Sequence, residues 1–275
     1  MVTPSEASPK IGVLLLGVRK SLGGRGLSDA LASLLASPLY SHPTAYFWRK
    51  SLSISNQFCE AVVSSGILSW EQMLNASCRY CIGGSKRGGV IFWQIDHEGR
   101  VHDGKVMYYM SDCHRNKAVH PTWVSALLRQ RDPFPNSPHE TSHCFFGLHL
   151  ISHTDFISDF PVGQSKSICV VEAEKTAFIL SELYPNHIWL AAGGLGEIQP
   201  DKFRPLRGHK VVMLPDTDPD GIAYKRWYEA ADVVMHSLFW EDSPPIYVSD
   251  FLERHASPSQ KSRKIDLVDF LQESL

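Results

Sequence analysis

Acidic side chains gather in two short stretches of the chain, each directly after an apolar run. The acids are Glu172 and Glu174 in the first stretch, and Asp216, Asp218 and Asp220 in the second. Carboxylates brought within a few ångströms repel one another, and protonation or a bound cation relieves the repulsion. Mg²⁺ prefers oxygen ligands and takes one or two carboxylates together with substrate phosphates. The pattern therefore predicts a site for Mg²⁺, or for Mn²⁺ in its place, and chemistry on phosphates.

The second acidic stretch has an ordinary alternative role as a helix cap. Asp is a preferred residue ahead of a helix, and Pro219-Asp220-Gly221 is common turn composition before the helix predicted from Ile222. One acid satisfies a cap, whereas three lie within five residues here. We therefore expect metal binding. The predicted ligands are Glu172, Asp216 and Asp218, and the additional candidates are Glu174 and Asp220.

The acidic stretches follow two of four apolar runs that alternate with helical stretches in the last third of the chain. The runs are Ile168–Val171, Ile188–Ala191, Val211–Leu214 and Ile246–Val248, and the helical stretches are Lys175–Leu183 and Ile222–Phe239. Runs without polar alternation are typical of strands buried on both faces, and strands alternating with helices form a parallel sheet flanked by helices. Functional side chains of such sheets collect beyond the carboxyl ends of the strands. Both acidic stretches are therefore expected at one edge of the sheet.

Three regions are predicted along the chain, within an α/β fold. Residues 1–44, rich in Ser, Pro, Gly and Leu, predict a poorly ordered leader or cap. Residues 45–161 predict a smaller α+β domain, and residues 162–275 the parallel-sheet domain. The strongest local signal in the α+β domain is a hairpin, in which Val90–Asp96 and Val101–Met110 flank a Gly-containing turn. Within the last region, Ser257–Lys264 is expected to be a polar link.

Composition excludes several classes of protein. A chain of 275 residues with 43% hydrophobic and 20% charged residues is typical of a globular protein that needs no disulfides to form a core. The longest early apolar run, Ile11–Val18, is too short to cross a membrane, and no export signal is recognised. Six scattered cysteines are then expected to be reduced thiols in the cytoplasm. A net charge of −2 argues against coating nucleic acid by bulk charge, so any nucleic-acid contact must be a local patch.

Such a patch is predicted before Met110. Lys86 and Arg87 lie in the Gly-rich segment Gly83–Gly89, and Arg100 and Lys105 lie in the predicted hairpin. Flexible backbone with cations suits contacts to phosphates, although a solvated loop is the ordinary alternative.

A zinc site is not expected from the cysteines. Cys78 and Cys81 have the spacing of half a zinc site, but the adjacent Cys113 and His114 do not form a second spaced pair. Reduced core or surface cysteines are the simpler interpretation.

The two acidic stretches together resemble a known domain. Glu172-Ala173-Glu174-Lys175 after an apolar run, then Asp216-Thr217-Asp218-Pro219-Asp220-Gly221 about 44 residues later, resemble the motifs of the TOPRIM domain of bacterial-type primases, topoisomerases and some nucleases. The resemblance implies that Glu172 acts in acid-base chemistry or metal binding and that Asp216 and Asp218 hold Mg²⁺. Ala173 departs from the EGEK-like variant of phage and plasmid primases, which commonly has Gly there.

Weaker resemblance reaches other segments. The predicted hairpin resembles the one ahead of the TOPRIM domain in primases, and Cys144–Leu150 resembles the link into that domain. Ala192–Gly196 resembles a Gly-containing turn near the active edge, with a plain turn as the alternative. Ile265–Leu271 resembles a late Asp-x-x-Asp segment, with an amphipathic terminal helix as the alternative. Together these features resemble primase-like proteins of bacterial mobile elements.

The resemblance implies primase-like, Mg²⁺-dependent nucleotidyl transfer on a single-stranded DNA template. Nucleotides, single-stranded DNA and a replicative helicase are the implied partners, in mobile-element or plasmid replication. Lys175 or Lys105 would neutralise phosphate charge. Two alternatives remain open: a TOPRIM nuclease in which Glu172 acts as base, and a non-catalytic nucleic-acid-binding accessory protein. The upstream hairpin favours the primase.

Overall fold

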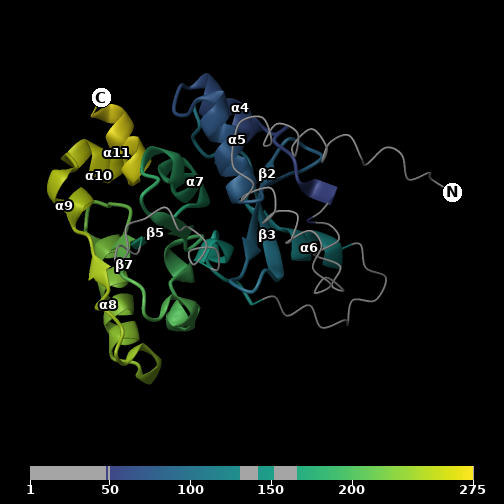
Figure 1. Ribbon diagram of the computed structural model, residues 1–275. Helices are drawn as coiled ribbons and strands as arrows, with labels where there is room; N and C mark the ends of the chain where they lie inside the picture. The colour runs from purple at the N-terminus through teal and green to yellow at the C-terminus, as the bar shows by residue number, and fades with distance from the viewer. Residues whose placement is uncertain (1–47, 49, 131–141, 152–165, 275) are drawn as a thin grey trace. The chain divides into compact units, whose positions relative to one another are not determined.

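The chain divides into two compact units, Met1–His143 and Cys144–Leu275. The computed structural model describes residues 48, 50–130, 142–151 and 166–274 (Figure 1). The leader predicted over residues 1–44 lies outside the described residues.

The first unit contains a four-stranded antiparallel sheet and helices. In spatial order its strands are β1 (Gly83–Gly84), β2 (Val90–Ile95), β3 (Val101–Met107) and β4 (Thr122–Trp123). Its described helices are α4 (Gln57–Ser64), α5 (Trp70–Arg79) and α6 (Val124–Arg129). Asn56 and Ser69 begin α4 and α5, because their side chains accept the backbone N–H groups of Cys59 and Gln72. The unit mixes helices and strands, as predicted.

The predicted hairpin is confirmed as β2 and β3. The two strands pair from Val90 opposite Met107 to Gln94 opposite Asp103, and the register shifts before Ile95. Gly99 provides the turn with a φ of 80°, which a residue with a Cβ rarely adopts.

The second unit is built on a parallel sheet, as the alternation of strands and helices predicts. In spatial order its strands are β6 (Ile188–Ala191), β5 (Ile168–Val171), β7 (Val211–Leu214) and β8 (Tyr247–Val248). Its helices are α7 (Glu174–Leu183), η2 (Leu195–Glu197), η3 (Pro200–Leu206), α8 (Ile222–Met235), η4 (Leu238–Trp240), α9 (Phe251–His255), α10 (Pro258–Arg263) and α11 (Leu267–Glu273). The crossover helices α7 and α8 lie on opposite sides of β5 and β7 (Figure 1).

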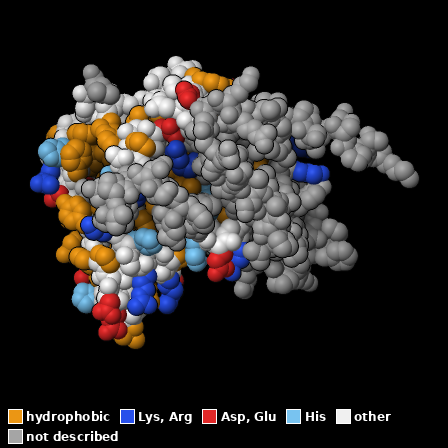
Figure 2. Space-filling model, in the orientation of Figure 1, with side chains coloured by type: hydrophobic (Ala, Val, Ile, Leu, Met, Phe, Trp, Pro, Cys, Tyr) orange, Lys and Arg blue, Asp and Glu red, His pale blue; other side chains and the backbone are white. Residues whose placement is uncertain are grey.

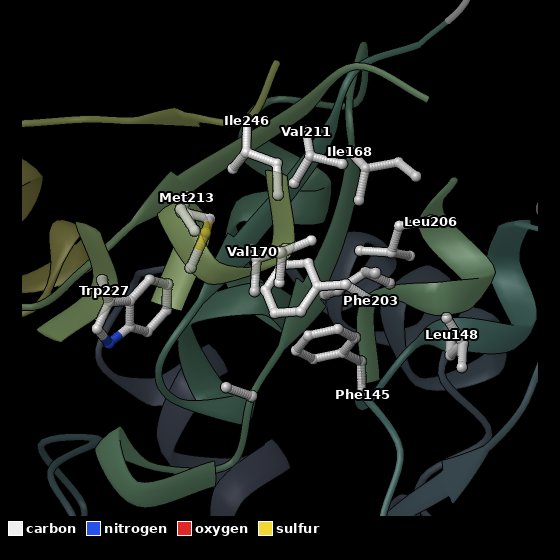
Figure 3. Close-up of a cluster of buried hydrophobic side chains, with 14 of the residues drawn as sticks. Phe145, Leu148, Ile168, Val170, Phe203, Leu206, Val211, Met213, Trp227 and Ile246 are labelled. Carbon is white, nitrogen blue, oxygen red and sulfur yellow. The ribbon is translucent and has the colours of Figure 1, made fainter. Parts of the chain in front are cut away.

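The core of this unit lies between the sheet, α8 and η3 (Figure 3). Val170 and Met213 of the sheet, Trp227 of α8 and Phe203 of η3 are fully buried in it. Each large buried apolar side chain contributes about 1.5–3 kcal/mol to folding, so this packing fixes the strand ends that carry the acidic stretches.

The segment from Cys144 belongs to the second unit. Phe146 exchanges backbone hydrogen bonds with Ala191 of β6, with N···O distances of 2.9 and 3.1 Å. Phe145 packs edge-to-face on Phe203 within the core. The division after His143 therefore falls earlier than residue 161, because this segment pairs with the sheet rather than only leading into it.

The polar link expected over Ser257–Lys264 is a helix instead. Ser257 and Gln260 form a reciprocal capping box at the start of α10, and Pro258 occupies the first turn, where its missing N–H is not needed. Lys264, at φ 57°, ends the helix.

The surface of the described residues carries mixed charge. On the face drawn in Figure 2, Lys and Arg side chains are interspersed with Asp and Glu, in keeping with the net charge of −2. None of the helices among the described residues has the length and apolar character needed to span a bilayer.

Candidate active site

The carboxyl ends of three parallel strands meet at one edge of the second unit. Val171 of β5 pairs with Ala191 of β6 on one side and with Leu214 of β7 on the other. Glu172 follows β5 by one residue and Asp216 follows β7 by two, so both leave the sheet at this edge. We call it the acidic edge. The predicted convergence of the two acidic stretches is confirmed for these residues.

Glu172 and Asp216 interact electrostatically at the acidic edge. Both side chains are half-buried. The pKa of Asp216 lies well above its usual value, because desolvation disfavours the carboxylate and the negative charges of Glu172 and Asp266 add to that effect. Without a cation, the carboxylate form of Asp216 is therefore disfavoured.

Asp218 faces a different environment, at the start of α8. Its Oδ1 accepts the N–H groups of Asp220 (2.9 Å) and Ile222 (3.1 Å), and its Oδ2 accepts that of Ala223 (2.6 Å). Burial would raise the pKa of Asp218, but these hydrogen bonds outweigh it and the pKa is lowered. The structure thus gives Asp218 the capping role that was the alternative to metal binding, and its role as a ligand stays a prediction.

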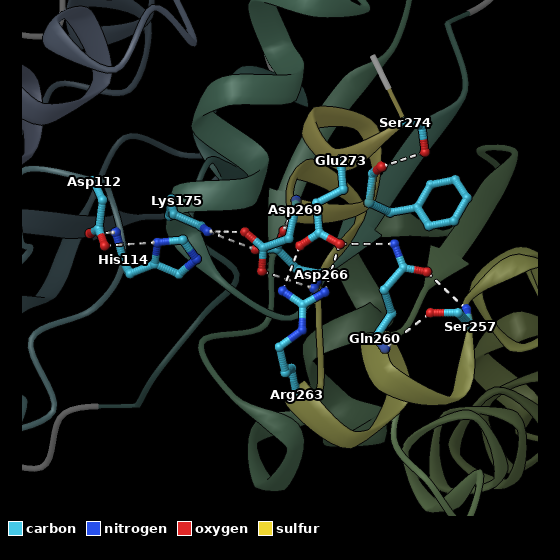
Figure 4. A network of polar contacts seen from close by, with 11 residues as sticks. Asp112, His114, Lys175, Ser257, Gln260, Arg263, Asp266, Asp269, Glu273 and Ser274 are labelled. Atoms are coloured by element: carbon cyan, nitrogen blue, oxygen red, sulfur yellow. Dashed lines mark hydrogen bonds and ion pairs between the residues drawn. The ribbon is translucent and has the colours of Figure 1, made fainter.

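Lys175 is held at the acidic edge as a counter-ion. Its Nζ lies 3.1 Å from Asp266 Oδ2 and 3.1 Å from Asp269 Oδ1, and its side chain is only 11% exposed (Figure 4). The predicted contact of Lys175 with substrate phosphate would have to compete with these two carboxylates.

The two additional candidate ligands, Glu174 and Asp220, differ in their exposure to solvent. Glu174 is buried in the first turn of α7, where a negative charge is favourable at a helix N-terminus. Asp220 is exposed, and its backbone N–H donates a hydrogen bond to Asp218 Oδ1. Neither side chain is placed in a metal-binding group by the described contacts.

Asp266 and Asp269 are members of the acidic edge that the sequence interpretation left out of the site. They form a capping box at the start of α11, and the Thr176 hydroxyl donates to Asp266 Oδ2 at 2.6 Å. Burial would raise the pKa of Asp266, but Lys175 and Thr176 lower it on balance. The Asp-x-x-Asp pattern in Ile265–Leu271 was the signal that could have found them.

The Gly-containing turn after β6 also reaches this edge. Gly193 donates its N–H to the backbone oxygen of Glu172 at 2.9 Å and has a φ of 94°. This bond holds the backbone of Glu172, which steadies the direction of its side chain.

The predicted basic residues are divided between exposed and paired positions in the first unit. Lys86 and Arg87 are exposed in the tight turn between β1 and β2. The Arg100 guanidinium is paired with Asp96 and Glu98, at 2.7 and 2.6 Å. Lys105 is half-buried in β3. Lys86 and Arg87 are therefore the better placed of the four for contacts to phosphates.

Cys78 and Cys81 are buried free thiols. Burial raises the pKa of Cys78 to about 11 and that of Cys81 to about 12, so both keep their protons at neutral pH.

The donors of the acidic edge suit a hard divalent ion with few protein ligands. Within the described ranges, no three His, Cys, Asp or Glu side chains are grouped closely enough to hold a metal ion. Glu172 and Asp216 provide two carboxylates, the number that Mg²⁺ commonly takes while keeping water and substrate phosphates as its other ligands.

Comparisons with known proteins give one family match and two similar structures. Residues 56–217 match the model of a family described as Domain of unknown function (DUF6371), a range that contains Glu172 and Asp216. No curated protein matches the chain.

The similar structures are primases at low identity. The primase fragment of the bacteriophage T7 primase-helicase protein is 16% identical, with a TM-score of 0.37 over 62% of this chain and 60% of that one. The Aquifex aeolicus primase, with zinc-binding and RNA polymerase domains, is 15% identical, with a TM-score of 0.39 over 99% of this chain and 62% of that one. The chain thus spans about three fifths of the length of each.

Proposed function

Since the chain belongs to the DUF6371 family, whose description names no function, we propose from its acidic edge that it catalyses Mg²⁺-dependent chemistry on phosphate esters. The carrying observation is the parallel pairing of β5 with β7, which brings Glu172 and Asp216 to one edge, where desolvation and the charge of Glu172 raise the pKa of Asp216. Two carboxylates held close together repel each other, and a bound divalent cation relieves this repulsion.

The form of this chemistry that we propose is primase-like nucleotidyl transfer on a single-stranded DNA template. A bound Mg²⁺ would supply charge stabilisation at the α-phosphate of a nucleotide while a 3′-hydroxyl attacks it and pyrophosphate leaves. Glu172 and Asp216 would hold the ion, and its charge would favour the carboxylate form of Asp216. The same proposal assigns the second unit to the TOPRIM type.

The other residues would act around this pair. Lys175 is paired with Asp266 and Asp269, so a divalent ion at Glu172 and Asp216 would lie beside two further carboxylates that already have a cation. Lys86 and Arg87 would contact template phosphates from the first unit. Mobile-element or plasmid replication, with a replicative helicase as partner, is the setting that the TOPRIM resemblance implies.

The test is incubation of the full chain with single-stranded DNA, ribonucleotides and Mg²⁺ or Mn²⁺. We expect new oligonucleotides from the wild type, and a loss of at least about 100-fold in Glu172→Gln and Asp216→Asn, because each removes a charged ligand. Asp201→Asn, an exposed acid of η3 paired with Arg204, is the matched control and should keep full activity.

The products separate the candidate functions. Shortened DNA that depends on Glu172 would mean a nuclease, and DNA binding without any product would mean an accessory protein. Equal product from Glu172→Gln and wild type would overturn the proposed site.

A further inference from the structure

We propose that Thr217, Glu253 and Lys261 position the Asp216 carboxylate, so that the C-terminal helices set the affinity of the acidic edge for a divalent ion. This inference rests on the proposed function and names residues that bind neither metal nor substrate themselves. It concerns the loop from Pro215 to Gly221, which connects β7 with α8.

Asp216, Thr217 and Asp218 are consecutive in this loop, and each interacts with different partners. Asp216 interacts electrostatically with Glu172 and Asp266, and Asp218 caps α8. Thr217, between them, is 1% exposed, and its backbone N–H donates to the oxygen of Ile265 at 3.2 Å. Because one residue separates the two acids, a rotation of the backbone at Thr217 would move both carboxylates together.

The Thr217 side chain is fastened to α9. Its Oγ1 donates to Glu253 Oε1 at 2.7 Å. A methyl group at Gly221 would lie 3.8 Å from Glu253 Oε2, so Glu253 also lies beside the far end of the loop. A single carboxylate from α9 therefore contacts or borders both halves of the loop.

Glu253 is in turn held by α10. Lys261 Nζ donates to Glu253 Oε2 at 3.0 Å and to the backbone oxygen of Glu253 at 2.7 Å. Both side chains are largely buried, with 18% of Glu253 and 24% of Lys261 exposed. The charge of Glu253 is thus neutralised away from the acidic edge, which leaves Glu253 as a hydrogen-bond acceptor for Thr217.

These contacts give the loop a fixed geometry before any ion arrives. Partners that hold a metal ligand in place commonly change metal affinity by about 10–100-fold when they are removed. Thr217 and Glu253 would hold Asp216 in place in this way. They act through the peptide bond between Asp216 and Thr217 and not through a hydrogen bond to the Asp216 side chain.

The experiment measures Mn²⁺ binding to the full chain by electron paramagnetic resonance of the free ion, with metal-free thermal unfolding of each variant. Thr217→Val keeps the shape of the side chain and removes its hydroxyl. We expect it to raise the dissociation constant for Mn²⁺ by about 10-fold. Thr217→Ser restores the hydroxyl and should bind within about twofold of wild type. Glu253→Gln, which loses the Lys261 ion pair, should also bind more weakly.

The matched control is Glu273→Gln. Glu273 of α11 is paired with Arg263 and Gln260 of α10, and its variant should bind Mn²⁺ as wild type does (Figure 4). Wild-type affinity in both Thr217→Val and Glu253→Gln would overturn the inference. Should Thr217→Val fail to fold, Glu253→Gln decides the question on the same criterion.

A separate arm tests the proposed function. If the wild type binds Mn²⁺ and Glu172→Gln does not, the metal site stands whatever Thr217 does. If the wild type binds no Mn²⁺, the metal site and the positioning role both fall.

Discussion

Asp96 and Asp103 of the antiparallel sheet and Asp216 beside the parallel sheet have opposite surroundings. In the first unit, Asp96 and Asp103 are almost fully buried, yet the pKa of each is lowered, because donors outweigh the desolvation that would raise it. In the second unit, desolvation and the charge of Glu172 raise the pKa of Asp216. Buried acids that meet donors stabilise a fold, whereas acids that meet acids make a place for a cation.

The difference follows from the topology of the two sheets. The turn between β2 and β3 brings Arg100 and His102 to Asp96, within six residues of it along the chain. Asp103 also has donors, although they come from farther along the chain: it accepts the Ser125 hydroxyl, and its Oδ2 lies 3.7 Å from His143 Nε2. The parallel strands β5 and β7 deliver two acids to one edge, where Glu172 and Asp216 meet.

The largest effect is expected at Asp103. Asp103→Ala should lower the free energy of unfolding by about 3–4 kcal/mol, because Ser125 and His143 lose a buried charged partner. Urea denaturation measures this loss. Asp112→Ala, an exposed acid of the same unit, should unfold like wild type. A similar curve for both variants would mean that the buried acid is not structural.

Replacement of Lys175 tests the same contrast in the second unit, because it removes the cation beside Asp266 and Asp269. Lys175→Met should destabilise the metal-free protein by about 2 kcal/mol, because Asp266 and Asp269 would then share the acidic edge without a counter-ion. The loss should shrink when Mg²⁺ is added. Lys225→Met, at an exposed position of α8, is the control, and equal unfolding curves for the two variants would contradict the counter-ion role.

Substitution of Asp218 tests whether an acid of the Pro215–Gly221 loop stabilises the fold. Asp218→Ala should lower the free energy of unfolding by about 1–2 kcal/mol, because α8 loses its cap. Asp218→Asn, which keeps an acceptor oxygen, should lose less. Thermal unfolding of both variants provides the measurement, and no loss in Asp218→Ala would show that the cap contributes nothing.

Asp216 should give the smallest effect, with the opposite sign. Its pKa in the folded protein lies above the ordinary value of 3.8, so its stabilising contribution is full below pH 3.8 and is lost as the pH rises through the folded-state pKa. Asp216→Asn should therefore raise the free energy of unfolding of the metal-free protein at pH 7.

The pH dependence distinguishes the two kinds of acid. Asp103 has a lowered pKa, so its contribution is present above 3.8 and is lost as the pH falls through its folded-state pKa. Unfolding of wild type, Asp103→Asn and Asp216→Asn between pH 3 and pH 8 without metal should show opposite trends for the two variants. Parallel curves would remove the distinction on which the comparison depends.

The sequence predicts what depends on local pattern. The hairpin, the alternation of strands and helices, and the meeting of Glu172 with Asp216 follow from periodicity and from the geometry of parallel sheets. The capping box of Ser257 and Gln260 is also a local signal, and it was overlooked when the segment was taken as a link.

Other features depend on distant contacts. Asp266 reaches Thr176 across 90 positions of the chain, and spacing alone does not encode that approach. The two acids of Asp216-Thr217-Asp218 share one motif but turn to different neighbours. Which of them caps α8 is decided by where the backbone of that helix begins.

The pairing of Phe146 with Ala191 has a consequence for making fragments of this protein. It occupies hydrogen-bonding positions along the outer strand of the parallel sheet, and unpaired edge strands invite pairing with other chains. A fragment cut at residue 162 would lack this cover and would also lose Phe145 from its interior. Such a fragment should self-associate more readily than one that begins near Ser142.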